Sequence, residues 1–168
     1  GRHAAPFDEG GGVAFDYARN VASTIVGTVT KPTVHNRQGV SSRTFTTGNH
    51  GYDFGTRAEY VIAGSFSVAL WLYATQAGSY QYVYSDYNSG GNTSSFSLRN
   101  PGGTLQFFWE TIAGGYSLLN APSATALNTW TFVVGTFSAV SPAPTPNKWL
   151  YINGKLGSSQ KDLSPRPA

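Results

Sequence analysis

Acidic residues are the first place to look for chemistry, because glycoside hydrolysis needs two carboxyl groups held about 5–5.5 Å or 6.5–9.5 Å apart. The chain has eight of them: Asp8, Glu9, Asp16, Asp53, Glu59, Asp86, Glu110 and Asp162. No two are separated by two, three or four positions, so no single strand carries a carboxylate pair on one face. A pair drawn from distant strands, such as Asp86 with Glu110, stays open. The sequence therefore favours a protein that is not an enzyme.

Other reactive residue patterns are missing from the sequence. It has no G-x-S-x-G, H-E-x-x-H, P-loop or G-x-G-x-x-G motif. It has no cysteine, which excludes disulfides, thiolate zinc ligands and cysteine nucleophiles. The three histidines, His3, His35 and His50, have no metal-binding partner at a suitable spacing, so they are typical of surface histidines.

Aromatic residues carry the remaining functional signal, because exposed rings stack on the apolar faces of sugars. In residues 65–74 the alternation predicts a core face that includes Phe66 and Leu70, and an opposite face that includes Trp71 and Tyr73. Neighbouring segments are also aromatic on both faces, which a single core does not need. The candidate ligand-binding residues are Trp71, Tyr73, Tyr82, Tyr84, Tyr87, Asn88, Asn92 and Trp109. Packing in the core, beneath loops or against a neighbouring subunit is the alternative for each.

The elements that would position these residues are short β-strands. Apolar residues alternate in short runs between Gly, Asn, Ser and Pro, and no segment keeps a 3.6-residue helical period. We expect strands near residues 43–47, 58–62, 65–74, 80–86, 94–99, 104–110, 116–120, 130–138 and 147–153. A glycine-containing turn at 100–103 separates two of them, and Asn153 with Gly154 predicts a hairpin with a further strand after it. This pattern predicts an all-β fold, a two-sheet antiparallel β-sandwich or jelly roll.

Five blocks of sequence, in order over residues 7–157, resemble laminin-G-like domains of the concanavalin A-like superfamily. They are the acidic, glycine-rich opening at 7–20, the strand and turn at 39–55, Gly-Ser-Phe-Ser-Val-Ala-Leu-Trp-Leu at 64–72, the segment 128–137, and Leu-Tyr-Ile-Asn-Gly-Lys at 150–155. The resemblance implies a two-sheet antiparallel jelly roll, which agrees with the strand pattern.

The end of the sequence departs from that family, in which a further pair of strands follows the Asn-Gly-Lys hairpin. Here 14 Pro-rich residues follow Gly154. We therefore expect the sandwich to lack its last strands and residues 158–168 to form a poorly ordered tail. Since natural proteins normally cover an open strand edge, we expect another protein chain to complete or cover the sandwich edge. The alternative is that the sequence is a cleaved or truncated piece.

The resemblance also implies calcium as a candidate cofactor, because such domains often hold one. A calcium ion needs six to eight oxygen ligands. Asp16 and Asn20, in the block that matches the family opening, could supply some of them. The alternative is that both residues bond their own backbone in a turn.

Composition limits the partners further. The net charge is only +3, and the seven Arg and four Lys are scattered singly, so we expect no nucleic-acid binding. The longest apolar run, 68–74, is far shorter than the roughly 20 residues of a membrane-spanning helix, so we expect no membrane insertion. Prolines at positions 142, 144 and 146 predict that residues 139–147 form a stiff, Pro-rich surface loop.

These features predict one domain over residues 1–168 with a non-catalytic role. We expect an extracellular recognition or adhesion module, at a cell surface or virion surface, that binds a carbohydrate or a surface receptor. The alternative is a structural or decoration component of a virion, filament or cell-surface assembly, which the Gly-, Ser- and Thr-rich composition also suits. The fold does not by itself separate these functions.

Overall fold

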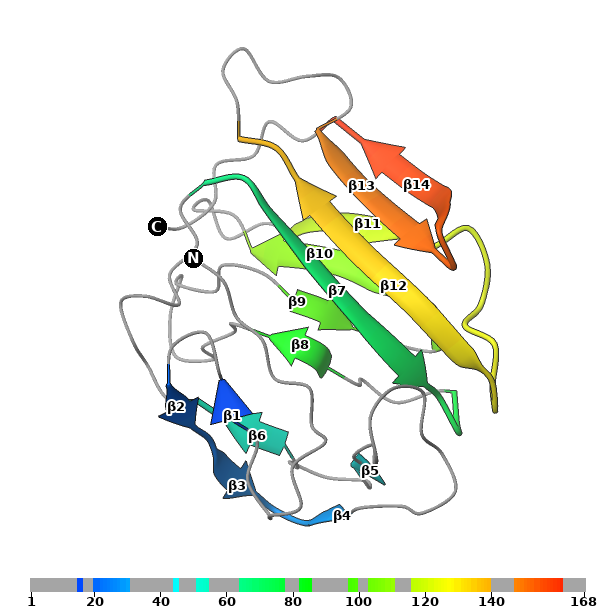
Figure 1. Cartoon of the computed structure of the whole chain (residues 1–168). Helices are drawn as coiled ribbons and strands as arrows, with labels where there is room; N and C mark the ends of the chain where they lie inside the picture. Colours follow the sequence, from blue (N-terminus) through cyan, green and yellow to red (C-terminus); the bar gives the residue numbers. More distant parts are fainter. Residues whose placement is uncertain are drawn as a thin grey trace. The chain divides into compact units, whose positions relative to one another are not determined.

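The computed structural model describes residues 15–16, 20–30, 44–45, 51–54, 64–77, 82–85, 97–99, 103–110, 116–139 and 147–161. They belong to two compact units, residues 1–60 and 61–168 (Figure 1). The single domain that the sequence predicts over both units stays a prediction. Among the described residues, regular structure is β-strand apart from a 3₁₀ turn at Gly103, and none of it is a long apolar helix of the kind that spans a membrane.

The first unit contains three short, two-stranded antiparallel ladders. They pair β1 (Phe15–Asp16) with β2 (Val21–Ala22), β3 (Thr24–Val26) with β6 (Gly51–Asp53), and β4 (Val29–Thr30) with β5 (Thr44–Phe45). The strand expected at 43–47 is β5, whereas the one expected at 58–62 lies outside the described residues. The other five were not predicted, because two or three residues are too few to show a period-two pattern.

The first sheet of the second unit has the strand order β14-β13-β12-β7. Its strands are β7 (Phe66–Tyr73), β12 (Trp130–Phe137), β13 (Lys148–Ile152) and β14 (Lys155–Gln160). β7 and β12 pair antiparallel over eight residues each, from Phe66↔Phe137 to Tyr73↔Trp130. These two central strands form the longest ladder of the described chain and fix which side chains share a face.

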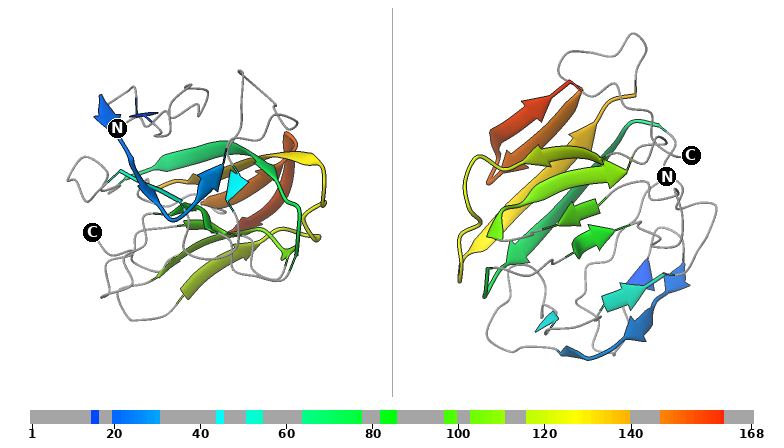
Figure 2. Two further views of the ribbon diagram at one scale, coloured as in Figure 1. Left: turned by 90° about the horizontal axis from the view of Figure 1, so that it is seen from below. Right: turned by 180° about the vertical axis from the view of Figure 1, so that it is seen from behind.

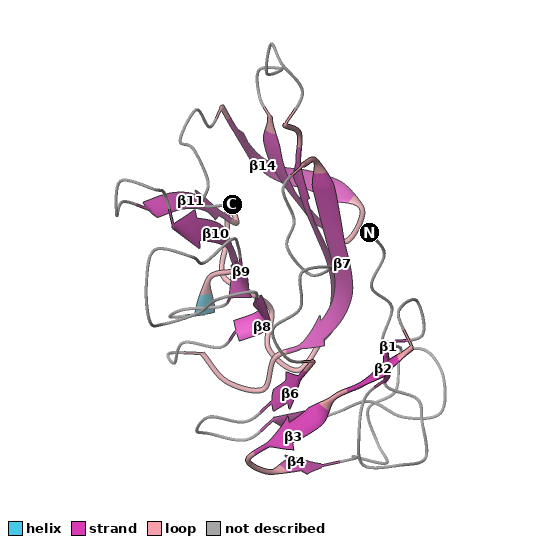
Figure 3. Ribbon diagram, turned by 90° about the vertical axis from the view of Figure 1, so that its left-hand side faces the viewer, coloured by secondary structure: helices cyan, strands magenta, loops and turns pink. Residues whose placement is uncertain are grey.

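The second sheet has the strand order β11-β10-β9-β8. Its strands are β8 (Tyr82–Ser85), β9 (Ser97–Arg99), β10 (Gln106–Glu110) and β11 (Tyr116–Asn120). All three pairings are antiparallel. Figures 2 and 3 show this sheet lying face to face with the first one. The two-sheet antiparallel sandwich predicted from the sequence is confirmed.

A hydrophobic core lies between the two sheets. It consists of Leu105, Phe107, Leu119, Val133 and Leu150, each at most 6% exposed. Along β12 buried residues alternate with partly exposed ones, and the partly buried Phe66, Val68, Leu70 and Leu72 of β7 pack against the core. The core face predicted for residues 65–74 is therefore correct. Burial of such side chains contributes about 1.5–3 kcal/mol each.

A buried lysine links the two sheets. Lys148, at the start of β13, is 0% exposed and faces the interior. Its Nζ donates to the carbonyl oxygen (3.1 Å) and to Oγ (2.9 Å) of Ser117 in β11, and lies 5.2 Å from the centre of the Phe107 ring. Ser158 of β14 also reaches the opposite sheet, since its hydroxyl donates to the Asn120 carbonyl at 2.6 Å. Polar bonds therefore supplement the apolar core on this side of the sandwich.

The last hairpin agrees with its sequence signal and corrects the predicted tail. Asn153 and Gly154 have φ values of 50° and 78°, the left-handed pair that a tight two-residue turn requires. β14 follows the turn and extends to Gln160. The predicted start of the tail at residue 158 is therefore at least three residues too early. Pairing with β13 holds these residues in place, despite a register shift between Leu150 and Tyr151. Residues 162–168 lie outside the described part of the chain.

The Pro-rich connection predicted at 139–147 joins β12 to β13. Its base is closed by a hydrogen bond from the Ser138 amide to the Asn147 carbonyl, at 2.9 Å. Residues 140–146 lie outside the described residues, so the conformation of the loop stays a prediction.

Candidate functional site

The outer face of the first sheet carries two pairs of aromatic rings. Trp71 of β7 lies 5.0 Å from Phe132 of β12, measured between ring centres, with the planes at 42°. Tyr73 lies 5.3 Å from Trp130 with the planes at 61°. Each pair joins residues directly opposite each other in the antiparallel ladder. The ladder therefore holds the four rings in two adjacent rows, on the side of the sheet away from the core.

The third strand continues this aromatic surface. In β13, Trp149 is opposite Thr136 and Tyr151 is opposite Val134, so both occupy the outer face. We call these six residues the aromatic face: Trp71, Tyr73, Trp130, Phe132, Trp149 and Tyr151. All six are partly exposed, neither buried nor fully open to solvent. The face thus holds three of the four tryptophans of the chain and leaves part of each ring accessible.

Among the described residues of the first sheet, the neighbours of the aromatic face are polar or aliphatic and uncharged. Next to it on β7 and β12, the Ser67 hydroxyl donates to the Thr136 hydroxyl at 3.2 Å. On β14, Leu156 is opposite Tyr151 and is 57% exposed, and the exposed Ser159 is opposite Trp149. Apolar ring surface beside hydroxyl groups, with no carboxylate or ammonium in these register positions, suits a neutral ligand that has both C–H and O–H groups.

The sequence predicted only part of this surface. Trp71 and Tyr73 lie on it as expected, opposite the core. Trp130, Phe132, Trp149 and Tyr151 were not predicted as site residues, although 130 and 132 also alternate along one strand. What the sequence did not provide was the pairing of residues 66–73 with 130–137, which are far apart in the chain.

The other predicted ligand residues are not brought to the aromatic face by the described structure. Tyr82 and Tyr84 lie in β8 and Trp109 in β10, both strands of the second sheet. The β8–β9 register shifts between Tyr82 and Tyr84. Tyr87, Asn88 and Asn92 lie outside the described residues. Their roles in binding stay predictions.

Asp16 and Asn20, predicted as calcium ligands, belong to the β1–β2 hairpin. Asp16 pairs with Val21, and Asn20 precedes β2 with a φ of 59°. Asparagine tolerates this left-handed conformation, so a turn role accounts for Asn20 without a metal. Within the described residues no three His, Asp or Glu side chains come together as a metal site. Two residues provide too few oxygens for a calcium ion, and the predicted site stays a prediction.

The carboxylate pair left open by the sequence, Asp86 with Glu110, is not tested by the described residues. Glu110 is the last residue of β10, and Asp86 lies outside the described part of the chain. The described structure thus adds no support for a hydrolytic pair.

Comparison with known families agrees with the fold. Residues 46–168 match the laminin-G-type model of the concanavalin A-like lectin/glucanases superfamily. The chain belongs to this superfamily. The match covers the resembling blocks at 64–72, 128–137 and 150–155 and the end of the block at 39–55, whereas the opening block at 7–20 lies before it. A comparison with curated proteins found no match. The superfamily contains both binding proteins and enzymes, as its name says, so membership establishes the fold and leaves the activity to the site.

Proposed function

We propose that the chain is a non-catalytic recognition module that binds a carbohydrate along its aromatic face. The observation that carries this proposal is the double row of rings on the outer face of β7 and β12, at ring-centre distances of 5.0 and 5.3 Å. Large rings normally lie in the core, which this sandwich already fills from its other face. A partly exposed aromatic cluster of this kind is typical of a binding surface.

The geometry suits a sugar chain better than a compact ligand. Residues two apart on a strand are spaced by about 7 Å, and neighbouring strands by about 5 Å, so the six rings form a broad platform. Successive sugar rings can stack on such a platform through their C–H faces. Ser67, Thr136 and Ser159 lie in the adjoining register positions and offer hydroxyls to the sugar edges. The uncharged surroundings favour a neutral oligosaccharide.

The proposal also includes the location of the protein. A module of this type acts outside the cell or on a cell or virion surface, where glycans are displayed. The absence of a carboxylate pair on any one strand of the sequence supports binding without hydrolysis.

The test is binding of neutral oligosaccharides to the full chain, followed by tryptophan fluorescence and by calorimetry. We expect quenching on binding, and a loss of affinity of at least tenfold in Trp71→Leu and in Phe132→Ser. Leu118→Ser is the matched control, because Leu118 is an exposed apolar residue in β11 of the other sheet. Its affinity should equal that of the unchanged chain.

Two results would overturn the proposal. One is a flat response to a broad glycan panel by a chain whose circular dichroism shows it folded. The other is binding that Trp71→Leu and Phe132→Ser leave unchanged. Release of reducing sugar from any bound oligosaccharide would contradict the non-catalytic part alone.

A further inference from the structure

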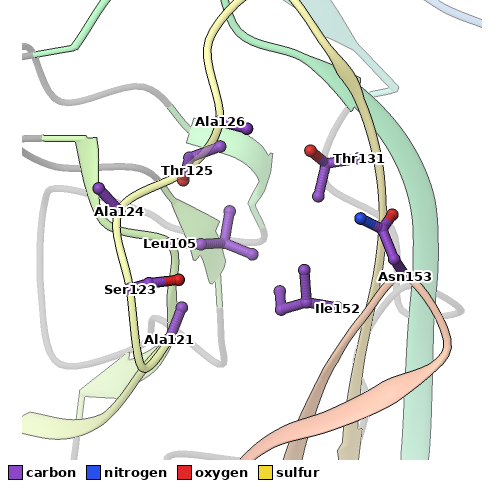
Figure 4. A pocket seen from close by; sticks show the side chains of 9 residues that line it. All are labelled: Leu105, Ala121, Ser123, Ala124, Thr125, Ala126, Thr131, Ile152 and Asn153. Carbon is purple, nitrogen blue, oxygen red and sulfur yellow. The ribbon is translucent and has the colours of Figure 1, made fainter.

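A cavity of about 220 Å³ lies between the two sheets, at the end where the β13–β14 hairpin turns. One wall is formed by residues 121–126, the segment between β11 and β12, and the other by Thr131, Ile152 and Asn153 (Figure 4). Leu105 lies between the walls as part of the apolar core. This cavity faces the interior side of β12, so it is separate from the aromatic face on the outer side of the same strand.

Both walls are held by backbone hydrogen bonds, so the cavity exists before anything binds. The amides of Ala121 and Thr125 donate to the carbonyls of Leu105 and Gly103, at 2.8 and 2.7 Å. On the opposite side, Asn153 makes two hydrogen bonds with Phe132, each at 2.8 Å. The backbone N–H of Asn153 donates to the Phe132 carbonyl, and the side-chain Oδ1 of Asn153 accepts from the backbone N–H of Phe132. A preformed cavity binds a ligand without an ordering cost for its walls.

Thr131 gives the cavity an unmet hydrogen-bonding group. The residue is 5% exposed, and its hydroxyl has no hydrogen-bond partner among the described residues. Figure 4 shows its side chain facing the cavity, across from Thr125 and Ala126. Buried hydroxyls nearly always have a partner, since an unmet one is costly. A molecule inside the cavity, either water or a ligand, can supply that partner.

Asn153 contributes a second polar group from the same wall. Because its Oδ1 accepts from the Phe132 amide, the Nδ2 group remains as a donor of two hydrogen bonds. Figure 4 shows this nitrogen turned toward the cavity. Ser123, Ala126 and Asn153 are exposed, so the mouth of the cavity lies between residues 121–126 and the hairpin turn, while Leu105 and Thr131 form its buried end.

The lining defines the chemistry of the ligand. The described lining has no ionisable side chain, so a phosphate or carboxylate would be buried without a counter-charge. Leu105, Ile152 and the alanines offer apolar contacts, whereas Thr131 and Asn153 offer a hydroxyl and an amide from one wall, and Ser123 and Thr125 offer hydroxyls from the other. The volume is below the roughly 300–1,000 Å³ of pockets for drug-sized ligands. We propose that this cavity binds one neutral, hydroxyl-rich ring of monosaccharide size, either as a free sugar or as the end of a glycan.

The test uses saturation-transfer NMR on the full chain with glucose, galactose, mannose and N-acetylglucosamine, each as the free sugar and as its methyl glycoside. We expect saturation transfer from the protein to at least one of these sugars. Thr131→Val keeps the shape and removes the hydroxyl, so affinity should fall at least tenfold while the Tm of the unliganded chain rises or stays the same. Ala126→Phe, at the mouth, should block binding. Binding of the methyl glycoside as well as the free sugar would identify the end of a glycan as the source; binding of the free sugar alone would identify the monosaccharide.

Controls separate this site from the aromatic face. Thr136→Val makes the same chemical change on the outer side of β12 and should leave monosaccharide binding intact, as should Trp71→Leu. Conversely, Thr131→Val should leave oligosaccharide binding at the aromatic face unchanged, so each proposal can fail alone. If the protein transfers saturation to none of the sugars, the cavity holds water only and the inference is overturned. Binding that survives both Thr131→Val and Ala126→Phe overturns it as well.

Discussion

Removal of the Ser117 hydroxyl should destabilise the sandwich through Lys148. The Lys148 ammonium is fully buried, and Ser117 Oγ accepts from it at 2.9 Å. A hydrogen bond to a charged group contributes about 1.5–3 kcal/mol, and the Ser117 carbonyl continues to accept in Ser117→Ala. We therefore expect the free energy of unfolding to fall by about 1.5–3 kcal/mol. For a chain of this length, that lowers the Tm by roughly 3–12 °C.

A double-mutant cycle isolates the contribution of the pair. Lys148→Met removes the ammonium and keeps an apolar stem beside the Phe107 ring, but leaves the Ser117 hydroxyl without this donor. In the double variant neither group remains, so neither is left unsatisfied. We expect it to be less destabilised than the sum of the single variants, by about 1–3 kcal/mol.

Urea unfolding followed by tryptophan fluorescence measures all four free energies, with thermal circular dichroism as a second probe. Ser159→Ala, at an exposed position of β14, is the control and should change stability by less than about 0.5 kcal/mol. Strict additivity of the two single variants would refute the reasoning. So would a Ser117→Ala chain as stable as the control.

Three further predictions concern the core, the metal and the assembly. Gly135→Ala should lower the free energy of unfolding by about 1–3 kcal/mol, because its Cβ would lie 3.2 Å from the fully buried Phe107 ring. Gly64→Ala is the control and should leave the stability unchanged, because there is open space around Gly64. If Asp16 binds calcium, calcium should raise the Tm, and both a chelator and Asp16→Asn should abolish the rise; an unchanged Tm rejects the site. If another chain covers the edge of the sandwich, light scattering on native material should give a mass well above the 17.9 kDa of one chain, and a stable monomer rejects that partner.

Sequence reasoning predicted the sandwich because short apolar runs between turn residues mark most of its longer strands. Residues 116–120 and 130–138 show this best, since β11 and β12 match them to within one residue. Short strands such as β1 and β4 were missed, because two residues carry no periodicity. Lys148 was missed for a different reason: a lysine predicts solvent exposure, and the two acceptor atoms that Ser117 supplies lie on the opposite sheet, far away in the sequence.

The candidate site was less predictable than the fold. Alternation alone placed Trp71 and Tyr73 away from the core. Their partners Phe132 and Trp130 depend on the register between two strands some sixty residues apart in sequence, which no local pattern specifies. The cavity beside Thr131 was beyond sequence reasoning altogether, because its walls come from four separate segments.

The burial of Lys148 has a consequence for chemical labelling. Lys155 and Lys161 are exposed, so an amine-reactive reagent should modify them at once in the folded protein. Lys148 reacts only when the sheets separate, since its nitrogen is enclosed between them. The extent of its modification over time, read by mass spectrometry, therefore measures how often the sandwich opens at Lys148, without denaturant.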